Sequence, residues 1–281
     1  LTYNKAYNNT EHGFSFNEDT TDTIVTGNNA TENGLDGFRL NSTQDMSFES
    51  NRAVNNTGNG LTVNNVFDPG GSNIPFTSDV YSDNGGHGAH TQNSTFLEFI
   101  GCNFTYNAQD GARIYNTTVT FKATDTSGPV ISEHNTGSGL NLTDSNNFNI
   151  LSSTPTGGED IIFRYNNQYG VYIYSSSGGT MTGVSSNYIT AHNNSRTGFY
   201  TYGSEDQTME YTQAYNNSED GFGIFSGSLN NNITRSRAYN NTQSGFCFMD
   251  NTRETTITEN IAMENGLDGF RLNSTQDMSF E

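Results

Sequence analysis

The sequence predicts an all-β fold in which short parallel strands wind into a β-helix. The main observation is a glycine followed by an apolar residue that recurs eleven times, with an asparagine always four residues before it. Successive glycines are 23 to 31 residues apart, a period typical of solenoids. The recurrence therefore indicates about 11–12 coils of 23–31 residues each. The glycines are Gly13, Gly37, Gly60, Gly88, Gly111, Gly139, Gly170, Gly198, Gly221, Gly245 and Gly269.

The residues after each glycine indicate the kind of solenoid. Apolar residues alternate with polar ones, as in Phe14-Ser15-Phe16, which predicts a strand with one buried face. No sustained helical period occurs, and eleven leucines in 281 residues are too few for a leucine-rich repeat. A single-stranded parallel β-helix remains, with like strands stacked about 4.8 Å apart.

The aligned asparagines predict a ladder. In a stack of coils the same residue recurs above itself, and an asparagine amide can bond to the amide of the next coil while tolerating a left-handed turn. The glycine is expected to be the point where the backbone re-enters the strand. The predicted ladder consists of Asn9, Asn33, Asn56, Asn84, Asn107, Asn135, Asn166, Asn194, Asn217, Asn241 and Asn265.

A second strand is predicted before each asparagine, for example over Val25–Ala30, Met209–Ala214 and Ile257–Ala262. In seven coils an alanine lies seven residues before the glycine. We expect this small residue to point inward and leave room for phenylalanine rings in the same layer. The alanines are Ala6, Ala30, Ala53, Ala191, Ala214, Ala238 and Ala262.

The repeated Asn-x-x-x-Gly-apolar-x-apolar motif resembles that of the right-handed parallel β-helix repeat family. That family includes pectin-degrading enzymes, alginate epimerases, phage tailspikes and many surface proteins. The resemblance covers nearly the whole chain and implies a right-handed coil. It says little about activity, because one fold carries many functions.

Composition limits the partners. The formal charge is −19 and only Lys5 and Lys122 are lysines, which argues against nucleic acid or an anionic membrane surface. No apolar run approaches about 18 residues, so no membrane span is expected. An acidic surface suits an extracellular or cell-surface location. The chain starts at Leu1 without methionine and is expected to be a processed product or a segment. Cys102 and Cys247 lie six coils apart, too far for a disulfide.

One continuous solenoid is expected over residues 1–281. Longer coils contain insertions near residues 68–75, 124–129, 152–159 and 175–180, and we expect the last three to form a lateral protrusion. Residues 32–49 are identical to residues 264–281, an offset of 232 residues that spans nine coils. The sequence therefore predicts one nine-coil unit over 1–232 and the start of the next over 233–281.

The sequence offers no catalytic arrangement. Gly86-His87-Gly88 resembles a short motif of polygalacturonase relatives, but the paired aspartates that those enzymes use are missing. The aspartates before coil glycines, Asp36, Asp110, Asp220 and Asp268, are interpreted as turn formers. The five histidines are scattered, and there is no spacing typical of metal ligands. We therefore expect no catalytic residue, metal or cofactor.

Thirteen Asn-x-Ser/Thr sequons occur, little above the number expected by chance. Five of them lie one residue before a ladder asparagine, at a turn from which a glycan could project: Asn8, Asn55, Asn193, Asn216 and Asn240.

These observations favour a non-enzymatic structural segment of a long secreted or cell-surface repeat protein, such as a fibre, sheath or stalk. Its expected partners are copies of itself, arranged head to tail along the solenoid axis, and glycans. The alternative is a carbohydrate-active enzyme or carbohydrate-binding module of the β-helix type, and a third hypothesis is an adhesin. A cluster of carboxylates with an arginine or lysine in one lateral groove would favour the alternative.

Overall fold

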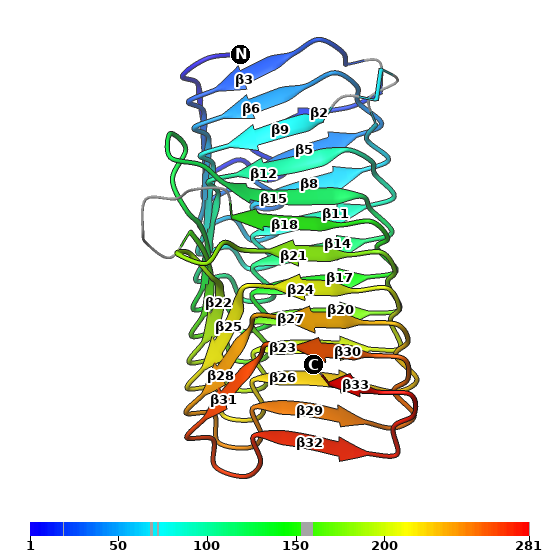
Figure 1. Cartoon of the computed structure of the whole chain (residues 1–281). Coiled ribbons are helices and arrows are strands. Elements are labelled where there is room, and N and C mark those ends of the chain that lie inside the picture. Colours follow the sequence, from blue (N-terminus) through cyan, green and yellow to red (C-terminus); the bar gives the residue numbers. More distant parts are fainter. Residues whose placement is uncertain (19, 68–69, 72, 153–159, 281) are drawn as a thin grey trace.

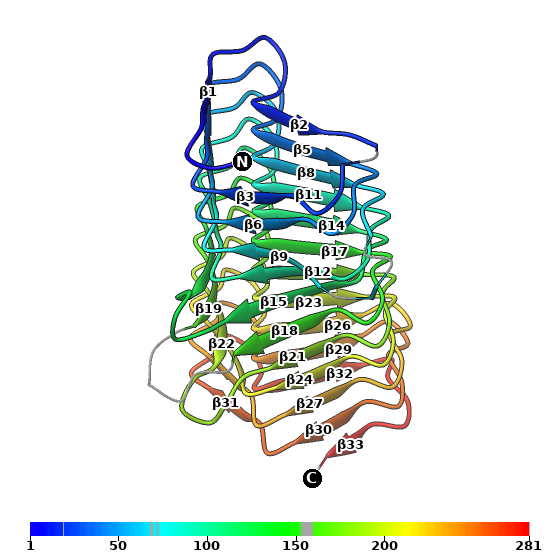
Figure 2. The same ribbon diagram turned by 90° about the horizontal axis from the view of Figure 1, so that it is seen from above.

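The computed structural model describes residues 1–18, 20–67, 70–71, 73–152 and 160–280, and it confirms the predicted fold class. The described chain winds through eleven coils, and three parallel sheets form the walls of an elongated prism (Figures 1 and 2). The described residues contain no helix and therefore no helix able to cross a membrane.

Each coil contributes one strand to each sheet. The first sheet contains β1 (Lys5–Tyr7), β4 (Asn29–Thr31), β7 (Arg52–Val54), β10 (Val80–Ser82), β13 (Asn103–Thr105), β16 (Val130–Glu133), β19 (Ile161–Arg164), β22 (Ile189–His192), β25 (Thr212–Tyr215), β28 (Arg237–Tyr239) and β31 (Ile261–Met263). The second contains β2 (Phe14–Phe16), β5 (Phe38–Asn41), β8 (Leu61–Asn64), β11 (Ala89–Gln92), β14 (Ala112–Tyr115), β17 (Leu140–Thr143), β20 (Val171–Tyr174), β23 (Phe199–Tyr202), β26 (Phe222–Phe225), β29 (Phe246–Met249) and β32 (Phe270–Asn273). The third contains β3 (Ile24–Thr26), β6 (Ser47–Glu49), β9 (Ile74–Thr77), β12 (Leu97–Ile100), β15 (Val119–Ala123), β18 (Asn149–Ser152), β21 (Thr180–Thr182), β24 (Thr208–Glu210), β27 (Asn232–Thr234), β30 (Thr256–Thr258) and β33 (Ser279–Phe280).

The core is a narrow column of stacked side chains. Because every strand pairs in parallel with the strand three further along the chain, equivalent residues lie above one another. Phe76 stacks on Phe99 with ring centroids 4.9 Å apart, and Phe99 stacks on Phe121 at 5.2 Å. A thin column needs few apolar residues per coil, which is how a chain of this acidic, polar composition can fold.

The strand predicted before each asparagine is in fact two strands in different sheets. Val25 belongs to β3 and Ala30 to β4, and a turn at Gly27, whose φ is 66°, separates them. Val25 and Ala30 are both buried although they are five residues apart, so the alternation shifts by one residue at this turn, a shift that the prediction of one strand overlooked. The inward position of the alanines is as predicted, since Ala30 and Ala214 are fully buried.

The asparagine ladder is present along the whole stack. The ten Nδ2 to Oδ1 hydrogen bonds between successive ladder asparagines measure 2.8–3.1 Å. The same Oδ1 also accepts the backbone N–H of the preceding coil, as between Asn166 and Asn194 at 3.1 Å. Each interior asparagine also donates to a carbonyl one coil back, so its polar atoms are satisfied without water.

The structure differs from the predicted turn in two details. The left-handed residue is the one before the ladder asparagine, and it is occupied by residues as different as Asn55, His134 and Tyr165. The coil glycine does not have a positive φ. It is required because a methyl group at Gly221 would lie 2.7 Å from the Gly245 carbonyl oxygen and 2.9 Å from Asn241 Nδ2.

Two of the described insertions lie at one corner, between the third and first sheets, whereas the described residues 70–71 and 73 of the first insertion precede β9, between the second and third sheets. Thr124 and Gly128 form an antiparallel bridge after β15, and Val184 and Asn187 form another after β21. The insertion predicted at residues 175–180 instead occupies residues 183–188, because residues 175–179 form the ordinary turn before β21 and Thr180 begins that strand. Residues 68–69, 72 and 153–159 of the predicted insertions lie outside the described residues.

Candidate functional site

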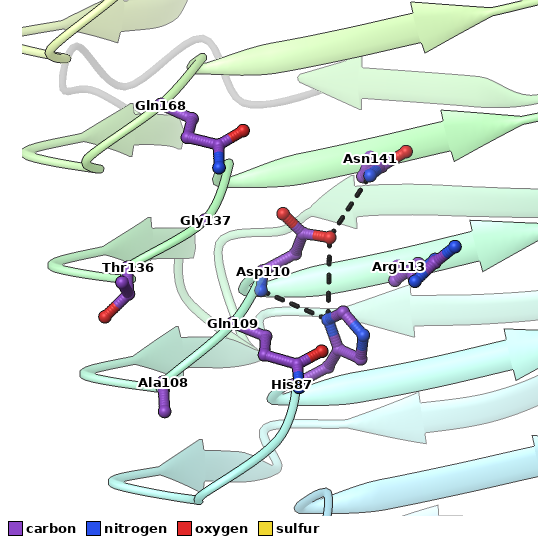
Figure 3. A pocket seen from close by; sticks show the side chains of 9 residues that line it. All are labelled: His87, Ala108, Gln109, Asp110, Arg113, Thr136, Gly137, Asn141 and Gln168. Carbon is purple, nitrogen blue, oxygen red and sulfur yellow. Dashed lines mark hydrogen bonds and ion pairs between the residues drawn. The ribbon is translucent and has the colours of Figure 1, made fainter.

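A pocket of about 350 Å³ lies on the outer face of the second sheet, near the middle of the solenoid (Figure 3). It is lined by His87, Ala108, Gln109, Asp110, Arg113, Thr136, Gly137, Asn141 and Gln168. These residues come from three consecutive coils and the start of a fourth. The pocket lies beside the turns that lead into β11, β14 and β17.

A second polar ladder positions the pocket's side chains. The residue immediately before each coil glycine accepts, through its side chain, the backbone N–H of its counterpart in the next coil. This holds without interruption through six coils, with bonds of 2.7–3.1 Å. The residues are His12, Asp36, Asn59, His87, Asp110 and Ser138. The interpretation of Asp36 and Asp110 as turn formers therefore missed their role as acceptors between coils.

His87 and Asp110 meet at the centre of the pocket. The backbone N–H of Asp110 donates to His87 Nδ1 at 3.1 Å, and Asp110 Oδ2 lies 3.5 Å from the same nitrogen. Because Nδ1 accepts a hydrogen bond, the ring proton is placed on Nε2. Asp110 Oδ1 accepts the Ser138 N–H at 2.7 Å, and Asn141 Nδ2 donates to Asp110 Oδ2 at 3.1 Å. The ring and the carboxyl group are thus both held in a fixed orientation.

Burial sets the protonation states of the pair. Desolvation, followed by the nearby His90 and Arg113, lowers the pKa of His87 to about 3, so the imidazole is neutral near neutral pH. Desolvation raises the pKa of Asp110, while its bonds to Ser138 and Asn141 and the charge of Arg113 oppose the rise. The site therefore combines a neutral N–H donor with a carboxylate that has an increased affinity for a proton.

Arg113 supplies the positive charge of the site. It occupies the outward position two residues after Gly111 and is directly paired with His90 in β11 and Asn141 in β17. Its side chain is exposed, whereas His87 is 5% exposed. The arrangement can hold an anionic group at Arg113 and bring the adjacent carbon towards Asp110.

A related set of residues occurs three coils earlier. The Asp36 N–H donates to His12 Nδ1 at 3.1 Å, and Arg39 is two residues after Gly37. There, however, Arg39 Nη1 lies 3.0 Å from His12 Nε2, so the arginine contacts the imidazole. Asp220 keeps the ladder bond to the Ser244 N–H at 2.8 Å, and Asp268 belongs to the last described coils. The four aspartates are thus dispersed along the axis, as predicted.

The pocket does not have the carboxylates of a glycoside hydrolase. Asp110 is the one carboxylate among the lining residues, and Asp36, at the same ladder position, is three coils away, or about 14 Å. The paired carboxylates of such enzymes are about 5–10 Å apart. Among the described residues, no group of three His, Cys, Asp or Glu side chains is placed to hold a metal ion.

The remaining predicted residues lie away from the pocket. Asn8, Asn55, Asn216 and Asn240 are exposed, and Asn193 is half-buried, with Nδ2 2.9 Å from His192 Nδ1. Cys102 and Cys247 are buried and form no disulfide with each other, as predicted.

Sequence reasoning missed the cluster of His87, Asp110, Arg113 and Asn141. The signal was present: a histidine before one coil glycine, an aspartate before the next, and an arginine two residues after that glycine. Aligning the coils on their glycines would have brought these residues together.

Comparison with known proteins supports this architecture. A family model described as "Right handed beta helix region" matches residues 1–100 and 130–281. No curated protein sequence matches the chain. The A-module of the Azotobacter vinelandii mannuronan C-5 epimerase AlgE4 is similar in structure, with a TM-score of 0.55 and 15% identity over 97% of this chain and 86% of that one. The periplasmic alginate epimerase AlgG gives a TM-score of 0.56 and 11% identity, over 96% of this chain and 76% of that one.

These matches correct the expectation that the chain is not an enzyme. The architecture from which a purely structural role was predicted is the architecture of carbohydrate-modifying enzymes. At these identities the likeness establishes the fold alone, so an activity has to be argued from the pocket itself.

Proposed function

Because the chain belongs to the right-handed β-helix family, and because its central pocket joins a fixed carboxylate to an arginine, we propose that it is a carbohydrate-modifying enzyme. Its substrate would be an acidic polysaccharide, and its reaction the removal of the proton next to a sugar carboxylate. The two similar structures act on mannuronan and alginate according to their names, which supports this substrate class.

The single observation that carries the proposal is the convergence of Asp110, Arg113 and His87 in one pocket. Arg113 would pair with the carboxylate of a uronosyl residue, which lowers the cost of building negative charge at the neighbouring carbon. Asp110 would take the C5 proton, helped by burial that raises its pKa. The neutral His87 would donate its Nε2 proton in a hydrogen bond to the developing anion.

The fate of the intermediate decides the product. Transfer of a proton from water to the opposite face of C5 gives the epimer, and the hydroxide left behind takes the first proton from Asp110. If the oxygen at C4 departs instead, it takes a proton from water, the glycosidic bond breaks, and a double bond forms between C4 and C5. Both outcomes begin with the same proton transfer to Asp110, and neither requires the second carboxylate that hydrolysis uses. An enzyme with such a substrate would work outside the cytoplasm, so we also propose a secreted or surface location.

The test is incubation of the purified protein with polymannuronate, polyguluronate and polygalacturonate in D2O. Proton NMR detects exchange or inversion at C5, and ultraviolet absorbance detects the unsaturated product. A neutral glucan serves as the substrate control. We expect C5 exchange, inversion or the unsaturated product with at least one polyuronate and none of these with the glucan.

The matched variants are Asp110→Asn and Asp220→Asn. Both aspartates occupy the same ladder position, with Oδ1 accepting the N–H of the next coil at 2.7 Å and 2.8 Å. Asp110→Asn should reduce the rate by about 100-fold or more, whereas Asp220→Asn should retain it. Absence of exchange, inversion and unsaturated product with all three polyuronates and the folded protein, or equal rates for both variants, would refute the proposal.

A further inference from the structure

A group of aromatic rings covers the second sheet just beyond the pocket. It consists of Tyr169, Tyr172, Tyr174, Tyr200, Tyr202 and Phe225, called here the tyrosine platform. The rings come from β20, β23 and β26 and from the turn before β20. Tyr174 and Tyr202 are exposed, and the other four are half-buried. The solenoid's own core does not use any of them, because all lie on the outer side of the sheet.

The platform continues the row of side chains that forms the pocket. Strand pairing places Arg113 beside Asn141, Asn141 beside Tyr172, and Tyr172 beside Tyr200. Tyr172 is therefore two strand spacings, or about 10 Å, from Arg113. Tyr169 occupies the position before its coil glycine that Asp110 occupies two coils earlier.

The rings form one contiguous surface. Tyr172 and Tyr200 are stacked with centroids 5.6 Å apart and an interplanar angle of 12°. Tyr174 and Tyr202 are stacked at 5.5 Å and 14°. Tyr169 joins the first pair, with its centroid 4.6 Å from that of Tyr200.

Phe225 of β26 extends the row of stacked tyrosine rings to a third strand. The residue paired with Tyr200 in β26 is Gly223, and a methyl group there would lie 2.4 Å from the Phe225 ring. Phe225 therefore folds back over the glycine, with its centroid 5.1 Å from that of Tyr200. An aromatic surface thus spans three strands without interruption.

Polar groups frame these rings. Arg196 Nη1 donates to the Tyr169 hydroxyl at 3.0 Å, and its guanidinium lies 5.4 Å from the centre of that ring. Burial and the neighbouring tyrosines raise the pKa of Tyr172 and of Tyr200, so both hydroxyls stay protonated in neutral solution. Flat apolar faces bordered by hydroxyl and guanidinium donors suit a sugar, which has an apolar ring face and a polar rim.

We propose that the tyrosine platform is a binding subsite that holds the same polysaccharide chain as the pocket, several sugar units away from the reacting one. A polysaccharide lying along the solenoid axis would place one unit at Asp110 and stack later units on Tyr172 and Tyr200. The proposal rests on the proposed function, because the pocket supplies the reason for a polysaccharide on this face. It implies that affinity for substrate increases with chain length until the platform is covered.

The proposed subsite is tested by measuring substrate binding and turnover separately. Uronate oligosaccharides of increasing length are titrated by calorimetry into the Asp110→Asn protein, which should bind without converting them. The platform variant is the Asp110→Asn protein that also carries both Tyr172→Ala and Tyr200→Ala. The matched control is Tyr165→Ala, since Tyr165 is also an exposed, stacked tyrosine but follows β19 of the first sheet, 5.0 Å from His134.

We expect the platform variant to bind long oligosaccharides about tenfold more weakly, to bind the shortest ones as before, and the control to match the parent. Tyr172→Phe with Tyr200→Phe keeps the ring faces and should retain most of the affinity. Saturation-transfer NMR on the unaltered protein should show transfer from aromatic protons to the sugars, which provides a readout if the alanine variant does not fold.

Equal affinity of the platform variant and the parent for long oligosaccharides, or no transfer from aromatic protons, would overturn the proposal. So would a variant whose single effect is reduced self-association, since the platform would then be a contact between copies of the chain. Length-dependent binding that requires the rings, without turnover by the unaltered protein, would support the subsite and refute the proposed function alone.

Discussion

At the scale of single residues, the buried Asp79 shows how one substitution in a ladder creates a response to pH. Asn4, Asn28, Asn51 and Asp79 form a third, short ladder in successive coils. Asp79 Oδ1 accepts from the N–H and Nδ2 of Asn51 at 2.6 Å and 3.1 Å. The Tyr81 hydroxyl donates to Oδ2 at 3.2 Å. Asp79 is fully buried, and desolvation raises its pKa from 3.8 to about 7 despite these bonds.

This shift predicts that Asp79 makes the protein less stable as pH rises. The folded state holds the proton up to about pH 7, while the unfolded chain releases it above 3.8, so the loss accumulates between these values. Asp79→Asn should remove this slope and raise the free energy of unfolding at pH 8 by as much as about 4 kcal/mol. Urea denaturation at several pH values measures the free energy of unfolding of both proteins. If the free energy of unfolding changes with pH equally in the parent and the variant, the prediction is wrong.

At the scale of the turn, the asparagine ladder gives a matched pair of substitutions. Asn166 is fully buried, accepts two hydrogen bonds from Asn135 at 3.0 Å and 3.2 Å, and donates to the Ser132 carbonyl at 3.1 Å. Its neighbour Asn167 is exposed.

Asn166→Ala should lower the free energy of unfolding by about 3 kcal/mol, because buried partners on both neighbouring coils lose their bonds. Asn167→Ala should change it by less than about 0.5 kcal/mol. Thermal and urea denaturation of both variants test this. If Asn166→Ala changes the free energy of unfolding as little as Asn167→Ala does, the ladder adds nothing to stability.

The left-handed turn residues are where glycans are expected. We predict glycans at Asn8, Asn55, Asn216 and Asn240 in protein from its native source, because these side chains are exposed. Asn193 should carry less, since its amide lies 2.9 Å from His192 Nδ1. Mass spectrometry of glycopeptides measures the occupancy. Material with all five sites bare would remove glycosylation from this account.

At the scale of the whole molecule, the internal repeat predicts axial assembly. The identical segments 32–49 and 264–281 include β5 and β32, which are nine strands apart in the second sheet. Nine coils at about 4.8 Å give an axial repeat of roughly 43 Å. We propose that copies associate head to tail, in the open arrangement that yields fibres.

Electron microscopy and light scattering of the purified chain test the assembly. Filaments with that axial spacing are expected at high protein concentration. A particle that stays monomeric over the same range, or filaments of unrelated spacing, would refute the association without affecting the proposed enzymatic site.

The spacing of residues along the chain was enough to predict the fold, the number of coils and the asparagine ladder. In a solenoid every coil meets its neighbours in the same register, so a residue that recurs once per coil has to lie above its counterpart. The spacing of residues along the sequence is therefore enough to predict which of them stack. The inward alanines and the separation of Cys102 from Cys247 followed from the same counting.

Tertiary structure alone decided how each coil is folded and where its outer side chains meet. The corner at Gly27 split an expected strand in two, because the left-handed turn there directs the backbone from the third sheet into the first. The meeting of His87 with Asp110 required the backbone N–H of one coil to bond to the side chain of another. The tyrosine platform depended on Phe225 lying over Gly223. Such contacts depend on side-chain direction and lateral packing, which a one-dimensional period does not contain.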